Sequence, residues 1–163
     1  RDDVESRGLG DVYKRQIFYI FASLNKNTLV METGNLSEDY RPLILVAEDD
    51  DSNFKLIKAI IGKKCEILWA KNGEEMVNLF KENRGKTAAI LMDIKMPIMN
   101  GLEATKIIRE EEKELPIIMQ TAYAFTADRE NAMAAGASEV LVKPITLSAL
   151  RTCLSKFLPR LQW

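Results

Sequence analysis

Three short apolar stretches of this chain each end abruptly in charged residues. They are Leu43–Ala47 before Glu48-Asp49-Asp50, Ala89–Met92 before Asp93, and Val140–Val142 before Lys143-Pro144. Apolar runs with charges at their carboxyl ends are typical of buried parallel strands that carry a site, because ligands bind at that edge of an open α/β sheet. Carboxylates gathered there repel one another, so we expect a hard divalent cation and the Lys143 ammonium to offset their charge.

From Leu43 onward, strand patterns alternate with helix patterns. We expect strands at 43–47, 65–70, 88–92, 116–120 and 139–142, and helices at about 52–61, at about 73–81, from 101 onward, at about 126–135 and at about 146–158. Strands that are each followed by a helix imply a parallel sheet with right-handed crossovers. Because an eight-fold barrel needs roughly twice this length, the sequence predicts a five-stranded, doubly wound α/β sheet of order 2-1-3-4-5, with helices on both faces.

Turn and cap residues support these boundaries. Asp51, Thr126 and Thr146 are candidate N-caps, and Gly136 fits the left-handed position after a helix. Lys143-Pro144 is a candidate cis peptide, because an X-Pro bond pays only about 0.5–1 kcal/mol for cis.

The composition excludes several functions. Of 163 residues, 47% are apolar, which is enough to build a hydrophobic core. The net charge of −1 gives no support for a protein that binds nucleic acid or a membrane surface. No apolar run reaches the roughly 18 residues that cross a bilayer. The chain has no histidine, which excludes Ser-His-Asp and Cys-His catalysis and a role as a phosphohistidine donor. We interpret Cys65 and Cys153 as buried free thiols.

The first 41 residues do not fit this pattern. Residues 8–16 look like translated adapter sequence, so we expect residues 1–16 to be non-native or disordered. We expect residues 17–21 to form a strand and the polar segment after them to be a linker. We therefore interpret 17–41 as the remnant of a preceding domain plus a linker, and 42–160 as one domain.

Several short motifs together resemble the receiver domain of two-component response regulators. They are Ala47-Glu48-Asp49, Met92-Asp93-Ile94-Lys95-Met96-Pro97 with Asn100-Gly101, Gln120-Thr121-Ala122, Ala134-Ala135-Gly136-Ala137 and Val142-Lys143-Pro144. Each motif alone is weak evidence for the family, but all of them in this order, at the ends of the expected strands, are specific for it. The resemblance extends from Leu43 to about Leu158. It implies a flavodoxin-like fold.

The resemblance also implies a Mg²⁺ site. Asp49 and Asp93 would bind the ion directly, the backbone carbonyl of Lys95 would add a further ligand, and Glu48 would reach the ion through water. Mg²⁺ suits such a site, because it prefers oxygen ligands and keeps several waters.

Three matched positions would handle the phosphoryl group. The resemblance implies that Asp93 is the phosphoacceptor, attacking the phosphorus of a phosphohistidine. Lys143 would hold a phosphoryl oxygen, and the Thr121 hydroxyl would donate to another. A carboxylate nucleophile needs no general base, which fits a chain without histidine.

The resemblance extends to partners and context. The donor would be a histidine kinase or a histidine phosphotransfer protein, and the chain reads as the C-terminal receiver of a hybrid sensor histidine kinase, cytoplasmic or in the cytoplasmic part of a membrane-anchored sensor. Such a receiver catalyses its own phosphorylation and dephosphorylation, while the kinase activity would belong to the parent protein. A homodimer through the fourth helix, fifth strand and fifth helix is a further expectation, and no nucleic-acid partner is expected.

Two alternatives remain open at this point: the chain could be a stand-alone response regulator or a pseudo-receiver that docks without phosphorylation. The sequence argues against a third, an aspartyl phosphatase, because such an enzyme needs Asp-x-Asp and Lys95 stands where its second acid would be. One departure from the family pattern is Val140, which replaces the usual aromatic residue three positions before the lysine, so the usual coupling through that aromatic is in doubt.

Overall fold

The structure is a computed structural model that describes residues 40–123 and 126–163. The predictions for residues 1–16, for the strand at 17–21 and for the linker up to residue 39 lie outside the described residues. No helix in the described ranges is long and apolar enough to span a membrane.

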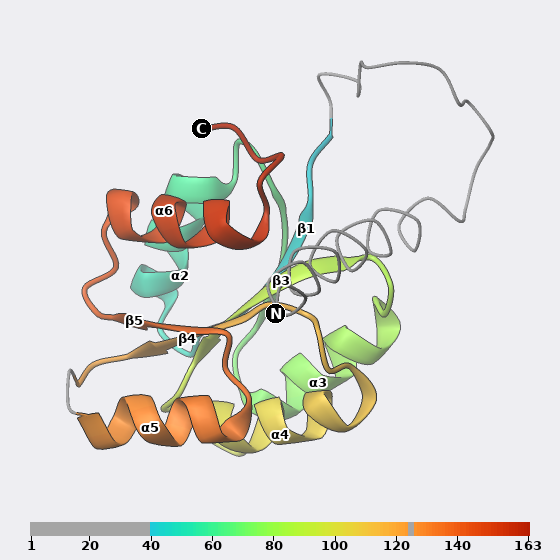
Figure 1. Cartoon of the computed structure of the whole chain (residues 1–163), viewed down its shortest axis with the longest axis vertical. Helices are drawn as coiled ribbons and strands as arrows, with labels where there is room; N and C mark the ends of the chain where they lie inside the picture. Colours follow the sequence, from blue (N-terminus) through green and yellow to red (C-terminus); the bar gives the residue numbers. More distant parts are fainter. Residues whose placement is uncertain (1–39, 124–125) are drawn as a thin grey trace, which may run out of the picture. The chain divides into compact units, whose positions relative to one another are not determined.

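The described part forms a five-stranded parallel sheet between two layers of helices (Figure 1). The strand order is β2-β1-β3-β4-β5, which confirms the predicted order. The strands are β1 Leu43–Ala47, β2 Glu66–Ala70, β3 Thr87–Asp93, β4 Ile117–Thr121 and β5 Glu139–Val142, and the helices are α2 Asp51–Ile61, α3 Gly73–Glu82, α4 Gly101–Glu111, α5 Thr126–Ala135 and α6 Leu147–Phe157.

Two hydrophobic clusters lie on opposite faces of the sheet. Along β3, Ala89 and Leu91 belong to the cluster under α2 and α6, whereas Ile90 and Met92 belong to the cluster under α3, α4 and α5. Burial of each such Leu, Ile or Met side chain stabilises the folded state by about 1.5–3 kcal/mol relative to leaving it exposed. Because successive side chains of a strand alternate between faces, Asp93 follows Leu91 toward the α2–α6 face.

The N-cap of α2 differs from the prediction by one residue. Asp50 has an extended backbone, and its side chain accepts a hydrogen bond of 2.8 Å from the Asn53 backbone N–H. Asp51, the predicted cap, is the first helical residue and pairs with Lys71 at 3.1 Å. The prediction of Asp51 was wrong because four consecutive acidic residues give no signal for where the extended backbone ends.

Other local predictions are confirmed. Thr146 caps α6 through a bond of 3.1 Å from the Ala149 N–H, and Gly136 has φ of 108°. The Lys143-Pro144 peptide is cis. Cys65 and Cys153 are both buried free thiols, although Cys65 lies just before β2 rather than within it.

Candidate functional site

Three carboxylates meet where β1 and β3 end. Glu48 and Asp49 follow β1, Asp93 is the last residue of β3, and one oxygen of each lies within 4.8 Å of the others. Glu48 and Asp93 are buried, whereas Asp49 is exposed. The parallel register of β1 and β3 brings these ends together, as the pattern of strand ends predicted.

The Lys143 ammonium lies between two of these carboxylates. Its Nζ atom is 2.8 Å from Glu48 Oε2 and 3.1 Å from Asp93 Oδ2. Lys143 follows β5, where its backbone N–H donates to the Thr121 carbonyl at 2.8 Å and so extends the pairing with β4. The topology thus joins a lysine and a glutamate that are 95 residues apart in the sequence.

Burial and neighbouring charges shift two pKa values at this site. Burial raises the pKa of Asp93, Lys143 lowers it, and the Glu48 charge raises it again, with a net increase. Burial alone would lower the pKa of Lys143, but its hydrogen bond to Glu48 and the nearby Asp93 charge outweigh that effect and raise it. Lys143 is therefore held in its charged form, whereas the charge on Asp93 is disfavoured by the fold.

We expect Asp93→Asn to raise the melting temperature of the metal-free protein at neutral pH, by about 2–6 °C. The raised pKa of Asp93 means that this carboxyl favours folding below its unfolded pKa and that this contribution is lost as pH rises through the folded pKa. Asparagine removes the disfavoured charge, while Glu48 still pairs with Lys143.

Thermal unfolding in chelator at several pH values measures this effect. The difference between the two proteins should shrink as the pH falls through the raised folded pKa of Asp93, and the charge-dependent part should be lost by about pH 4, where a free aspartate also takes up a proton. A lower melting temperature for the variant at pH 7 would contradict the argument.

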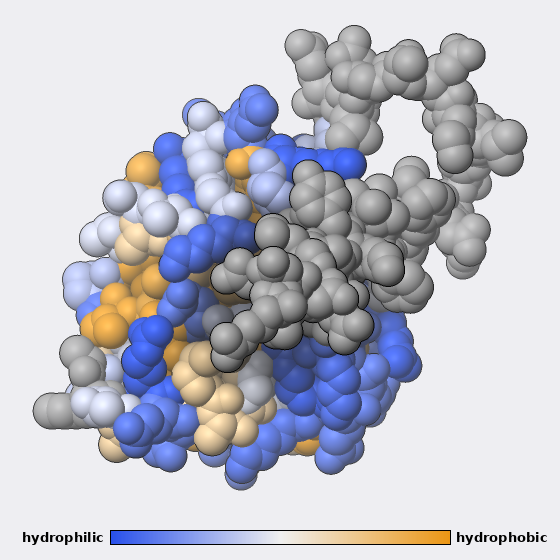
Figure 2. Space-filling view, in the orientation of Figure 1, coloured by the Kyte–Doolittle hydropathy of each residue, from blue (hydrophilic) through white to orange (hydrophobic). Residues whose placement is uncertain are grey.

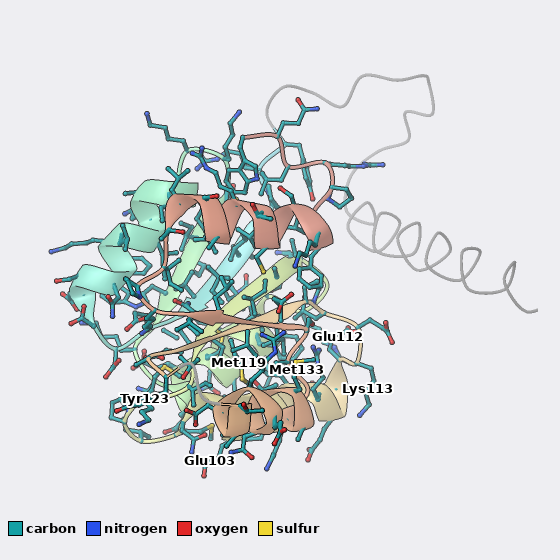
Figure 3. The ribbon with its side chains drawn as sticks, turned by 60° about the vertical axis from the view of Figure 1, so that its left-hand side comes forward. Glu103, Glu112, Lys113, Met119, Tyr123 and Met133 are labelled. Atoms are coloured by element: carbon teal, nitrogen blue, oxygen red, sulfur yellow. The ribbon has the colours of Figure 1, made fainter. Side chains whose placement is uncertain are left out.

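Thr121 and Tyr123 lie beyond the acidic cluster at the end of β4. Thr121 is buried, and its hydroxyl oxygen accepts a hydrogen bond of 3.1 Å from the Tyr123 backbone N–H. The Lys95 ammonium lies 4.2 Å from the centre of the Tyr123 ring. Figure 3 shows Tyr123 at the opposite end of the sheet from Glu112 and Lys113, on the side where the strands end.

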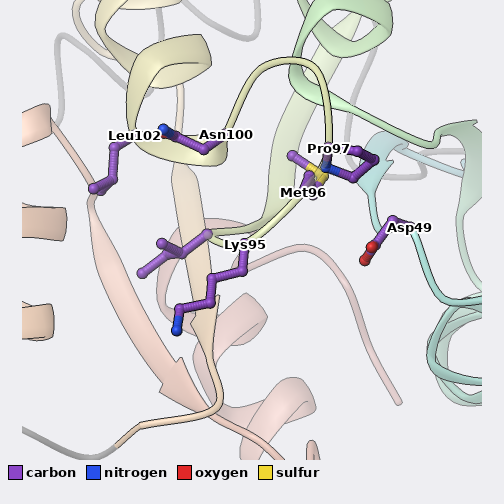
Figure 4. Close-up of a pocket in the computed structure, with 7 residues that line it drawn as sticks. Asp49, Lys95, Met96, Pro97, Asn100 and Leu102 are labelled. Carbon is purple, nitrogen blue, oxygen red and sulfur yellow. The ribbon is translucent and has the colours of Figure 1, made fainter.

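A groove of about 540 Å³ opens beside Asp49. Its lining comes mainly from the β3–α4 loop and the start of α4: Ile94, Lys95, Met96, Pro97, Asn100 and Leu102. Figure 4 shows Asp49 near the loop of Met96 and Pro97 with its carboxylate turned away from that loop, while the Lys95 side chain extends away from Asp49. The groove therefore gives a solvent-side approach to the exposed carboxylate of the cluster.

Two contacts to Glu48 were not predicted from the sequence. The Asn53 side-chain amide donates to Glu48 Oε1 at 3.3 Å, and the Trp69 indole N–H donates to the Glu48 backbone carbonyl at 2.8 Å. Asn53 lies in the first turn of α2, five residues after Glu48, a spacing that could have suggested its contact. No pattern in β2 indicates the contact of Trp69, because it depends on the pairing of β1 with β2.

The donor set fits a hard divalent cation. Carboxylate oxygens are the ligands that Mg²⁺ prefers, and it accepts one or two of them together with water. Three carboxylates against one ammonium leave a formal charge near −2, which such a cation would neutralise. The exposed Asp49 leaves the cluster accessible from solvent.

Residues 44–155 match the model of the response regulator receiver domain family. The chain is 42% identical over 110 residues to hybrid signal transduction histidine kinase I of Dictyostelium discoideum; the match covers 63% of this chain but only 6% of that protein. The chain thus spans a small fraction of the length of this curated relative.

Two solved receiver structures are similar in both fold and sequence. One is the receiver domain of a sensor histidine kinase from Pseudomonas aeruginosa PAO1, solved with a magnesium ion coordinated in the active-site cleft (TM-score 0.66, 32% identity, 72% of this chain and 98% of that chain). The other is the receiver domain of the Saccharomyces cerevisiae response regulator Ssk1, co-crystallised with the histidine phosphotransfer protein Ypd1 (TM-score 0.67, 31% identity, 72% of this chain and 88% of that chain).

Proposed function

Because the chain belongs to the response regulator receiver family, we propose that it takes a phosphoryl group from a phosphohistidine onto Asp93 and relays a signal from there. The observation that carries this proposal is the Lys143 ammonium held between Glu48 and Asp93 at the end of the sheet. The site then contains a carboxylate nucleophile, a fixed positive charge and two further carboxylates for a cation.

In the proposed reaction, one oxygen of Asp93 attacks the phosphorus of the donor. An O–P bond forms to give an acyl phosphate, the N–P bond of the phosphohistidine breaks, and the imidazole leaves with the electron pair. Lys143 sits within 3.1 Å of Asp93, so its ammonium would meet the charge of the transferred group. Thr121, which now accepts from Tyr123, has a hydroxyl proton with which it would bind a phosphoryl oxygen.

Asp49 and Asp93 would hold Mg²⁺, with Glu48 reaching it through water and the Lys95 carbonyl as a further ligand. When bound, the ion supplies positive charge that screens the crowded oxygens of a phosphoryl transfer. The role of the Lys95 carbonyl stays a prediction that the resemblance alone supports.

The donor would be a histidine kinase or a histidine phosphotransfer protein, and the chain would act as the cytoplasmic receiver of a hybrid histidine kinase. The similarity to a hybrid kinase of Dictyostelium supports this assignment. A homodimer would use the face of α5, β5 and α6, where Met133, Val142 and Leu147 are about half exposed. Figure 2 shows hydrophobic surface near the end of β5, on the side where α6 follows.

The direct test is to incubate the chain with acetyl phosphate and Mg²⁺ and to measure its intact mass. We expect a single phosphoryl adduct that does not form when a chelator is added first. The absence of an adduct, with or without metal binding, would contradict the proposed function and favour a receiver that acts by docking alone.

Mg²⁺ should also stabilise the fold. A ligand that binds only the folded state at ten times its Kd adds roughly 1.4 kcal/mol, which corresponds to a rise in melting temperature of about 5 °C. Thermal unfolding across a Mg²⁺ series, with Asp49→Asn as the comparison, measures this. An equal rise in that variant would show that the ion binds elsewhere.

A further inference from the structure

Trp69 contacts the peptide unit that joins two of the site's carboxylate residues. Its indole N–H donates to the Glu48 carbonyl at 2.8 Å, and this carbonyl belongs to the same peptide unit as the Asp49 N–H. The orientation of that peptide unit sets the backbone angles on both sides of it. It therefore sets the directions in which the Glu48 and Asp49 side chains leave the backbone.

The Trp69 ring is itself fixed by two neighbours. The Phe54 ring of α2 stacks on it with centroids 4.0 Å apart and planes inclined by 2°. The Lys71 ammonium lies 4.6 Å from the Trp69 ring centre and also pairs with Asp51 at 3.1 Å. The indole is thus tied to the first turn of α2, which follows directly after the loop of Glu48 and Asp49.

The two carboxylate residues depend on this contact to different degrees. Glu48 is fully buried and has further side-chain partners in Lys143 and Asn53. Asp49 is exposed, so its carboxylate is oriented chiefly by its backbone. A donor that fixes the preceding peptide unit reduces the freedom that a metal ion must otherwise remove when it binds.

We propose that Trp69 is a positioning residue for the divalent cation site, acting through the Glu48 carbonyl to orient Asp49; this inference rests on the proposed function. Outer-shell partners that orient metal ligands change metal affinity when they are removed, even though they do not touch the ion. Trp69 does this from an edge strand, through one hydrogen bond to backbone.

The test compares Trp69→Phe with Trp163→Phe in the full chain. Both substitutions keep an aromatic ring and remove one indole donor, since Trp163 donates to Ser155 Oγ at 2.9 Å, outside the acidic cluster. Mg²⁺ affinity is measured by calorimetry, and the rate of adduct formation from acetyl phosphate is measured over a Mg²⁺ series.

We expect Trp69→Phe to weaken Mg²⁺ binding about tenfold and Trp163→Phe to leave it unchanged. Excess Mg²⁺ should restore the adduct rate of Trp69→Phe to near that of the unmodified chain, because no reacting group has been removed. A role confined to stability would lower the melting temperature of Trp69→Phe and leave the Mg²⁺ affinity as it was. Equal affinities in the two variants would overturn the inference.

The unmodified chain separates this inference from the proposed function. If that chain binds no Mg²⁺ and forms no adduct, the proposed function fails and the inference fails with it. If it does both and Trp69→Phe matches it, only the inference fails. Should Trp69→Phe not fold, Phe54→Leu loosens the same ring while keeping the donor; a weaker Mg²⁺ affinity supports the inference, and an unchanged one overturns it.

Discussion

Asp93→Asn should abolish the phosphoryl adduct completely, at any concentration of Mg²⁺ or acetyl phosphate. An amide oxygen carries no full negative charge and cannot form a stable acyl phosphate. The variant should nevertheless fold, because Lys143 retains its bond of 2.8 Å to Glu48. Intact mass after incubation with acetyl phosphate, together with thermal unfolding of the same samples, measures both outcomes.

Asp128→Asn is the matched control for that experiment. Asp128 lies in the first turn of α5, outside the cluster of Glu48, Asp49 and Asp93. We expect this variant to form the adduct at the rate of the unmodified chain. An adduct on Asp93→Asn would mean that another residue accepts the phosphoryl group.

Gly101→Ala should both destabilise the domain and slow phosphoryl transfer. Gly101 begins α4, and an added methyl group would collide with the backbone carbonyl oxygen of Asp93 and lie 2.9 Å from Met92 Cγ. Overpacking of this kind costs about 1–3 kcal/mol, partly offset by the better helix propensity of alanine. Because the clashing oxygen belongs to the backbone, the end of β3 must move to make room for the methyl group. A displacement of about 1 Å at a reacting group can lower the rate roughly a hundredfold.

Gly85→Ala separates the two parts of this prediction. Gly85 has φ of 76°, and an added methyl group there would meet nothing within 4 Å. We expect a loss of roughly 1 kcal/mol from the left-handed backbone and an unchanged adduct rate. If Gly101→Ala matched this control in both unfolding and adduct rate, the close approach of α4 to Asp93 would not matter to the site.

The fold was predictable because the strands are short, apolar and separated by amphipathic helices. The sheet order followed from chain length and from the handedness of the crossovers. Strand boundaries were less certain, since β3 extends from Thr87 through Asp93, beyond the predicted stretch at both ends. Asp93 thus belongs to the strand itself, because it still pairs with Gln120 of β4.

For the site, the sequence predicted only that the charged residues at the strand ends would lie close together. The ends of β1 and β3 had to meet in a parallel sheet, so the approach of Glu48, Asp49 and Asp93 followed from topology. The pairing of Lys143 with Glu48 as well as Asp93 did not follow, because it depends on side-chain reach across β3 and β4. The contact of Trp69 with a backbone carbonyl leaves no trace in the residue pattern.

The position of Lys143 also bears on how the domain is assembled in a cell. With an internal counterion beside two of its three carboxylates, the chain need not wait for metal in order to fold, unlike small metallo-domains that are unfolded without their ion. Newly made protein can therefore be complete before it encounters the Mg²⁺ of the proposed site. The ion would then be an exchangeable ligand whose occupancy follows its free concentration, and a receiver that lost it would be reloaded without refolding.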